Sequence, residues 1–115
     1  MYKMVDLSFL KEFTKGDTRK MKRYINLYLN VAPDTFVKMR QNIQKEEWDQ
    51  LRIHAHSLKP QADYMGIPDL KALLMDIENN TNNEDEQMLS DLFNKAYQIH
   101  IKSEAILKEA IDHLT

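Results

Sequence analysis

The chain has no cysteine, and this absence removes several kinds of chemistry at once. Without thiols there is no disulfide, no thiolate metal site and no cysteine nucleophile. The sequence also lacks an apolar run near the roughly 18 residues of a membrane span, and its first residues, MYKMVDLSFLKEF, lack the apolar block of a signal peptide. We therefore expect a cytoplasmic chain without membrane contact, either a stand-alone protein or a domain of a longer one.

An excess of charge of one sign is missing as well. The 16 basic and 18 acidic residues leave a net charge of −2, and there is no basic tail. This balance argues against nucleic-acid binding. TRKMKRY at 18–24 is a local basic cluster, which we interpret first as a solvated helix face and second as a steering surface for an acidic partner. No glycine-rich phosphate loop is present, so we expect neither an ATP site nor kinase activity.

Helix breakers are scarce, with two glycines and three prolines in 115 residues. Leu, Lys, Glu, Gln, Met and Ala are common, and apolar residues do not alternate with polar ones over a useful length. This composition predicts an all-α protein. The length suits a single domain over residues 1–115.

Apolar spacing predicts one short helix and four long ones. The short helix is DLSFLKEF, with Asp6 as its N-cap, and Asp17 or Thr18 is expected to cap the next. Long helices are expected at about 18–44, 47–65, 68–79 and 85–113. Gly66 and Pro68 mark the end of one and the start of another. The inward residues of the last helix are expected to include Met88, Leu92, Ala96, Ile99, Leu107 and Ile111.

The second helix contains Pro33, which we expect to kink it or to split it near Val31. Four long helices with short connections favour an antiparallel four-helix bundle. The predicted fold is therefore such a bundle, with a short extra N-terminal helix and a proline-kinked or split second helix.

Two histidines stand two residues apart in RIHAHSLKPQADYMG, residues 52–66. Helical residues turn by about 100° each, which places His54 and His56 about 200° apart and excludes a shared metal ion. The chain also lacks the Glu-x-x-His pair of di-iron bundles, so no metal or other cofactor is expected. The core stripe of this helix is predicted to be Leu51, Ala55, Leu58, Ala62 and Met65. His54 lies at the edge of that stripe and is expected to be a partly buried structural residue.

His56 lies away from the predicted core stripe, on the face that also carries Arg52, Lys59 and Asp63. An exposed neutral imidazole is a good nucleophile near neutral pH. Lys59, one turn later, can hold an anion placed on that ring, and a phosphoryl group is the obvious anion. On its own, a His-x-x-Lys pair more often belongs to an ordinary solvated helix face. Ile53 is apolar and predicted to be exposed one turn before His56, as single exposed apolar residues often are.

The longer segment AHSLKPQADYMGIPDLKALLMDIE resembles the histidine-containing phosphotransfer (Hpt) domains of multistep, two-component phosphorelays. The signature of that family is Ala-His-x-Leu-Lys-Gly, followed by a glycine and an amphipathic helix that ends near an acidic residue. The matching residues are Ala55, His56, Leu58, Lys59, Gly66, Leu70, Leu73, Leu74 and Ile77. The upstream segments DLSFLKEF and EEWDQLRIHAHSLK are also similar, so that the resemblance covers nearly the whole chain.

The resemblance implies that His56 is the phosphoacceptor and that Lys59 stabilises the phosphorylated state or the transfer geometry. It implies receiver domains of response regulators or hybrid kinases as partners, with Mg²⁺ held by the receiver. Gly66 would keep the surface low where a partner docks. The docking surface is expected to include Arg52, Ile53, Pro60, Asp63, Tyr64 and Gly66, with the short first helix as a candidate extension.

Pro60 is a departure, since the family has glycine directly after the lysine. Proline removes one helical hydrogen bond, so a bend or a widened turn is expected beside His56. The implied function is a phosphorelay intermediate that takes a phosphoryl group from one receiver aspartate and passes it to another. The alternative is a helical adaptor that docks receiver or kinase domains without being phosphorylated.

Overall fold

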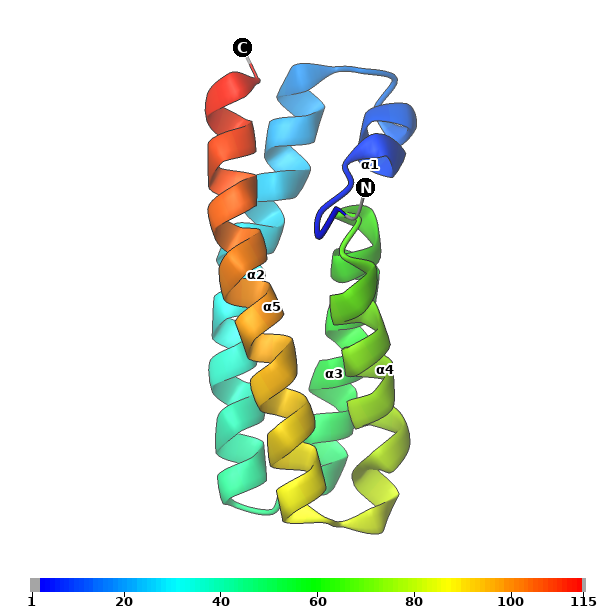
Figure 1. Ribbon diagram of the computed structural model, residues 1–115, viewed down its shortest axis with the longest axis vertical. Coiled ribbons are helices and arrows are strands. Elements are labelled where there is room, and N and C mark those ends of the chain that lie inside the picture. Colours follow the sequence, from blue (N-terminus) through cyan, green and yellow to red (C-terminus); the bar gives the residue numbers. More distant parts are fainter. Residues whose placement is uncertain (1–2, 115) are drawn as a thin grey trace.

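The computed structural model describes residues 3–114, and within that range it contains helices and no strand. The elements are α1 (Ser8–Phe13), α2 (Thr18–Gln44), α3 (Trp48–Tyr64), α4 (Pro68–Asn80), the 3₁₀ turn η1 (Thr81–Asn83) and α5 (Glu86–His113). Figure 1 shows the four long helices side by side, with α1 beside the end of the bundle where α3 passes into α4. The predicted all-α bundle with a short extra helix is confirmed. Among the described residues, no helix is long and apolar enough to cross a membrane.

Side-chain caps begin the two longest helices, and the prediction of a cap at Asp17 is confirmed. Asp17 accepts a hydrogen bond from the backbone N–H of Lys20 at the start of α2, and Asp85 accepts one from Met88 at the start of α5. The first helix differs, because its N-cap is Leu7 and not Asp6. The Asp6 carboxylate lies one residue earlier, where it accepts hydrogen bonds from both the N–H and the hydroxyl of Ser8.

Pro33 lies inside α2, which continues without a break from Thr18 to Gln44. The alternative of a split near Val31 is therefore wrong. Proline removes a single N–H, whereas the buried residues on both sides of it, Ala32 and Phe36 among them, hold α2 against the rest of the bundle. Tertiary packing thus outweighs the local preference for a break.

The core is a continuous cluster of side chains from all five α-helices and their connections. The buried residues of α2 include Met21, Ile25, Tyr28, Ala32, Phe36, Met39 and Ile43, and Tyr24 and Leu29 pack at the edge of the core. In α5 the predicted register is partly wrong, because Met88 is exposed and its neighbour Leu89 is buried. The buried face of α5 is Leu89, Phe93, Ala96, His100, Ser103 and Leu107. The polar residues His100 and Ser103 interrupt the apolar spacing of that face, so the sequence predicted it only in part.

The connection between α3 and α4 is a tight helical hairpin. Gly66 has a left-handed backbone with φ of +65°, and the Ile67 N–H donates to the Ala62 carbonyl at 2.9 Å. Pro68 occupies the first turn of α4, as predicted. A short antiparallel connection of this kind brings together residues that are equally far from its centre at Ile67. This register determines which α4 side chains can reach the outward face of α3.

Candidate functional site

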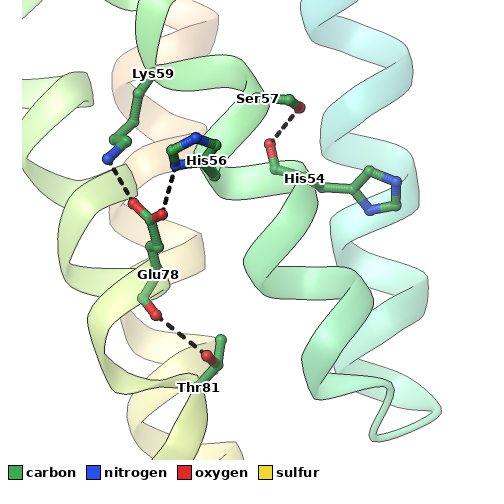
Figure 2. A network of polar contacts seen from close by, with 6 residues as sticks. All are labelled: His54, His56, Ser57, Lys59, Glu78 and Thr81. Atoms are coloured by element: carbon green, nitrogen blue, oxygen red, sulfur yellow. Dashed lines mark hydrogen bonds and ion pairs between the residues drawn. The ribbon is translucent and has the colours of Figure 1, made fainter.

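His56 lies on the outward face of α3 with 68% of its side chain exposed. Its Nδ1 atom is 2.6 Å from Oε2 of Glu78, which comes from the neighbouring helix α4. Figure 2 shows the ring turned toward this carboxylate. The predicted exposure of His56 is confirmed, and the contact with Glu78 gives the ring a fixed orientation.

Glu78 joins His56 to Lys59. Its second carboxylate oxygen, Oε1, lies 2.5 Å from the Lys59 ammonium, and the two side chains are only 18% and 20% exposed. The hydrogen bond from Lys59 is the main cause that lowers the pKa of Glu78, and the hydrogen bond from His56 adds to it. Glu78 is therefore an anion at neutral pH. Its two oxygens contact the His56 imidazole and the Lys59 ammonium, which lie one helical turn apart on α3.

This arrangement selects one form of the imidazole. A carboxylate can only accept a hydrogen bond, so the His56 Nδ1 atom carries the proton that lies between them. The lone pair is then on Nε2, the other ring nitrogen. A largely exposed ring with a free Nε2 lone pair is suited to nucleophilic attack on an electrophile brought by a partner.

His54 has different surroundings. Its Nδ1 atom is 2.7 Å from Oδ1 of Asn42 on α2, and the ring is partly buried. Burial is the main cause that lowers the pKa of His54, and the charge of Lys38 lowers it further. Figure 2 shows the two rings pointing away from each other, His54 toward α2 and His56 toward α4. The division into a structural and an exposed histidine, predicted from helical spacing, is confirmed.

The residues predicted to form the docking surface lie along the outward face of α3, except Gly66, which lies in the connection to α4. Arg52 is 3.8 Å from Asp49, and Ile53 is half exposed. The Asp63 carboxylate accepts a hydrogen bond from Lys71 of α4 at 2.9 Å. A groove beside the helix is lined by Phe9, Pro60, Asp63 and Tyr64. That a partner docks on these residues stays a prediction.

Pro60 does not widen the helix. α3 is α-helical from Trp48 to Tyr64, so the expected widened turn beside His56 does not form. Leu58 and Ala62, on either side of the proline, are buried in the core and hold this stretch in place. Pro60 itself is exposed.

Gly66 meets a backbone requirement that the sequence did not reveal. A Cβ atom on Gly66 would lie 1.6 Å from the carbonyl oxygen of Asp6, and the Asp6 N–H donates to the Gly66 carbonyl at 2.8 Å. The N-terminal segment therefore packs directly on this glycine. A part for Gly66 in partner docking stays a prediction.

Sequence reasoning missed Glu78 as an individual residue. The signal was present in the hairpin, because His56 and Glu78 are each 11 residues from Ile67, on opposite sides. The ion pair between Asp63 and Lys71, each four residues from Ile67, follows the same register. Within residues 3–114, no group of three or more histidine, aspartate and glutamate side chains is arranged to hold a metal ion.

Residues 23–114 match the model of the Hpt domain, and the chain belongs to this family of phosphotransfer domains. Members of the family are phosphocarrier modules of two-component phosphorelays, where they interact with receiver domains. Among solved structures, the chain is similar to histidine-containing phosphotransfer protein B (HptB) from Pseudomonas aeruginosa PAO1, with 14% identity, a TM-score of 0.90 and 100% of both chains covered. At that identity the likeness shows a common fold. No curated protein sequence matches the chain.

Proposed function

We propose that His56 is the phosphoacceptor of a relay between receiver domains. In this proposal a receiver with a phosphorylated aspartate docks on the outward face of α3, and His56 takes the phosphoryl group. A second receiver then removes it onto its own aspartate. The observation that carries the proposal is the 2.6 Å contact between Nδ1 and Glu78, which leaves Nε2 of an exposed ring as the nucleophile.

The proposed transfer needs no reactant besides His56 and the phosphorylated receiver. The Nε2 lone pair attacks phosphorus as the bond between phosphorus and the aspartate oxygen breaks, and the aspartate leaves as a carboxylate. The ring keeps its proton on Nδ1 and becomes positively charged. Glu78 stabilises that charge, because its hydrogen bond to Nδ1 strengthens as the ring becomes cationic. Transfer to the second receiver is the reverse of the same step.

In the proposed transfer, Lys59 and the receiver each supply part of the electrostatic stabilisation of the phosphoryl oxygens. Phosphoryl transfer depends mainly on positioning and on stabilisation of the oxygens around phosphorus. Lys59 is held beside the ring by Glu78 and supplies one positive charge near the incoming phosphoryl group. The receiver supplies the Mg²⁺ ion, so this chain has no cofactor of its own. We place the exchange in the cytoplasm, as expected from the sequence.

A relay experiment separates a carrier from an adaptor. Receiver domains phosphorylated with acetyl phosphate are separated from the unreacted donor in a buffer that contains Mg²⁺ and mixed with the chain, and a second receiver is then added. A carrier gains acid-labile phosphate from the first receiver and loses it to the second, whereas an adaptor binds without gaining phosphate. His56→Gln should abolish the gain, and the matched His54→Gln should retain it. Equal loss in both variants would contradict the assignment of His56.

A further inference from the structure

The face formed by α2 and α5 lies across the bundle from His56. Each long helix packs against two neighbours, in the order α2, α3, α4 and α5 around the bundle. The boundary between α2 and α5 is therefore opposite the boundary between α3 and α4, where Glu78 contacts His56 and Lys59. In the lower half of Figure 1, α2 and α5 stand together on one side and α3 and α4 on the other. A receiver docked at His56 leaves the α2/α5 face uncovered.

The centre of the α2/α5 face is uncharged and partly apolar. At helical spacing it consists of Leu29, Pro33 and Val37 of α2 and Asn94, Tyr97 and Ile101 of α5. Val37 is 53% exposed and Ile101 is 41% exposed, although apolar side chains gain free energy from burial. Both line a hollow of about 170 Å³ between the two helices. A charge-free apolar centre is typical of the core of a protein interface.

Charged residues flank this centre, and their order is reversed between its two sides. α2 and α5 run in opposite directions in Figure 1, so Lys22 and Lys108 lie toward the end of the bundle that carries α1, and Glu86 lies toward the other end. Glu104 comes between Lys108 and the centre. Arg40 lies on the side of Glu86, because its guanidinium is over two aromatic rings in the first half of α5, at 5.4 and 5.0 Å. Along the face the order is positive, negative, centre, positive, negative.

A twofold axis across this face brings opposite charges together. Rotation by 180° about an axis that crosses both helices near Tyr97 turns a second copy end over end and lays its α2/α5 face on the first. Glu86 and Lys108 are each 11 residues from Tyr97, or about 16 Å along α5, so Lys108 of one copy comes level with Glu86 of the other. Arg40 of each copy likewise comes level with Glu104 of the other. The face is therefore complementary to itself.

The inner charges and the size of the face both suit a dimer. Among residues 3–114, no carboxylate forms an ion pair with Arg40. The ion-pair contacts of Glu104 within the chain are long, at 3.7 Å to His100 and 3.8 Å to Lys108. The bundle measures 45 × 28 × 21 Å, so even the narrower of its long sides offers roughly 900 Å², close to the ~800 Å² that each partner of a stable complex buries.

We propose that two copies of the chain associate through the α2/α5 face in an antiparallel, twofold arrangement. Val37 and Ile101 lie at the centre of this interface, and Arg40 of each copy pairs with Glu104 of the other. The dimer does not rest on the proposed function, because no phosphate transfer is needed to form it. It leaves the two His56 rings on opposite outer sides, where each can meet a receiver.

The first test measures mass by sedimentation equilibrium over a range of concentrations. Wild type should reach twice the 13.6 kDa of one chain. Ile101→Glu, which places a charge in the apolar centre, should raise the dissociation constant of the dimer by about tenfold or more. Ile106→Glu is the matched control, because Ile106 is also 41% exposed on α5 but is turned about 140° away from Ile101. A wild type that stays monomeric at millimolar concentration, or an equal effect of the two variants, would overturn the proposal.

Exchanging the inner charges tests the antiparallel arrangement. Arg40→Glu and Glu104→Arg each place like charges opposite one another, so each variant alone should dimerise about tenfold more weakly than wild type. An equal mixture of the two variants should dimerise again, because each chain supplies the charges that the other lacks. Single variants that associate like wild type, or a mixture that does not recover, would contradict the pairing. Thermal unfolding shows whether each variant is folded, and the comparison of Ile101→Glu with Ile106→Glu decides if a charge variant is not.

Discussion

Replacing Glu78 with glutamine changes the charge beside His56 while it keeps the size of the side chain. The amide oxygen can still accept from Nδ1, but the hydrogen bond loses its ionic character. Hydrogen bonds to charged groups contribute about 1.5–3 kcal/mol, roughly twice the value for neutral pairs. Because His56 is 68% exposed, solvent screening reduces the difference. We expect the transition state to lose about 1–1.5 kcal/mol of stabilisation, which makes transfer about five- to twelvefold slower by the relation of about 1.4 kcal/mol per tenfold.

The assay is single-turnover transfer at saturating phosphorylated receiver, so that docking does not limit the rate. Asp76→Asn is the matched control. It removes an exposed carboxylate from the same helix, and the contacts of His56 and Lys59 with α4 are made by Glu78 and not by Asp76. Nitrogen NMR of the His56 ring reports the second consequence. Wild type should hold the proton on Nδ1, and Glu78→Gln should show a mixture of the two tautomers. An unchanged rate together with an unchanged tautomer would refute the part given to Glu78.

Three further predictions concern individual residues. Lys59→Ala should slow transfer severalfold and shorten the lifetime of phosphohistidine while the thermal unfolding temperature stays near that of wild type; an unaltered lifetime would contradict it. Gly66→Ala should destabilise the chain by more than the roughly 1–2 kcal/mol of a left-handed alanine, because its Cβ would meet Asp6. Gly16→Ala, with φ of +76° and no atom near its Cβ, should cost only that amount in the same denaturant titration. Burial lowers the pKa of His100 from 6.5, so the unfolded chain takes up the proton first and stability should fall as pH decreases below about 6.5; unfolding at pH 7.5 and 5.5 should show a weaker pH dependence in His100→Gln.

The helices were predictable because their signals are local. Asp17 and Asp85 stand at helix starts, and Gly66 followed by Pro68 separates α3 from α4. Helical spacing alone was enough to assign His54 to the interior edge and His56 to the surface. Local rules failed at Pro33, where the packing of a long buried stripe holds α2 together as one helix.

The inward face of α5 was predicted only in part, because two of its buried residues are polar. His100 and Ser103 are buried on its inward face, although both residues are polar. His100 is accommodated because its Nδ1 lies 2.8 Å from the hydroxyl of Tyr28 on α2, and its ring stacks on Phe36. These partners of His100 come from a distant part of the chain, so the sequence of α5 alone does not show that His100 is buried. Without that position, the apolar spacing favoured Met88 over its neighbour Leu89 as an inward residue.

The site was predictable to the extent that it lies on one helix. His56 and Lys59 are three residues apart and share a face, whereas Glu78 reaches them only through the register of the α3–α4 hairpin. The choice of Nε2 as the nucleophile depends on that contact and therefore required the structure. The contacts among the rings of Phe9, Phe13, Tyr24 and Tyr64 likewise depend on how α1, α2 and α3 meet.

The most direct measurement is to locate the phosphate after transfer from a phosphorylated receiver, by mass spectrometry under neutral to alkaline conditions that spare phosphohistidine. We expect a single phosphate, on His56. Phosphate on another residue, or no phosphate from receivers that do bind, would contradict it.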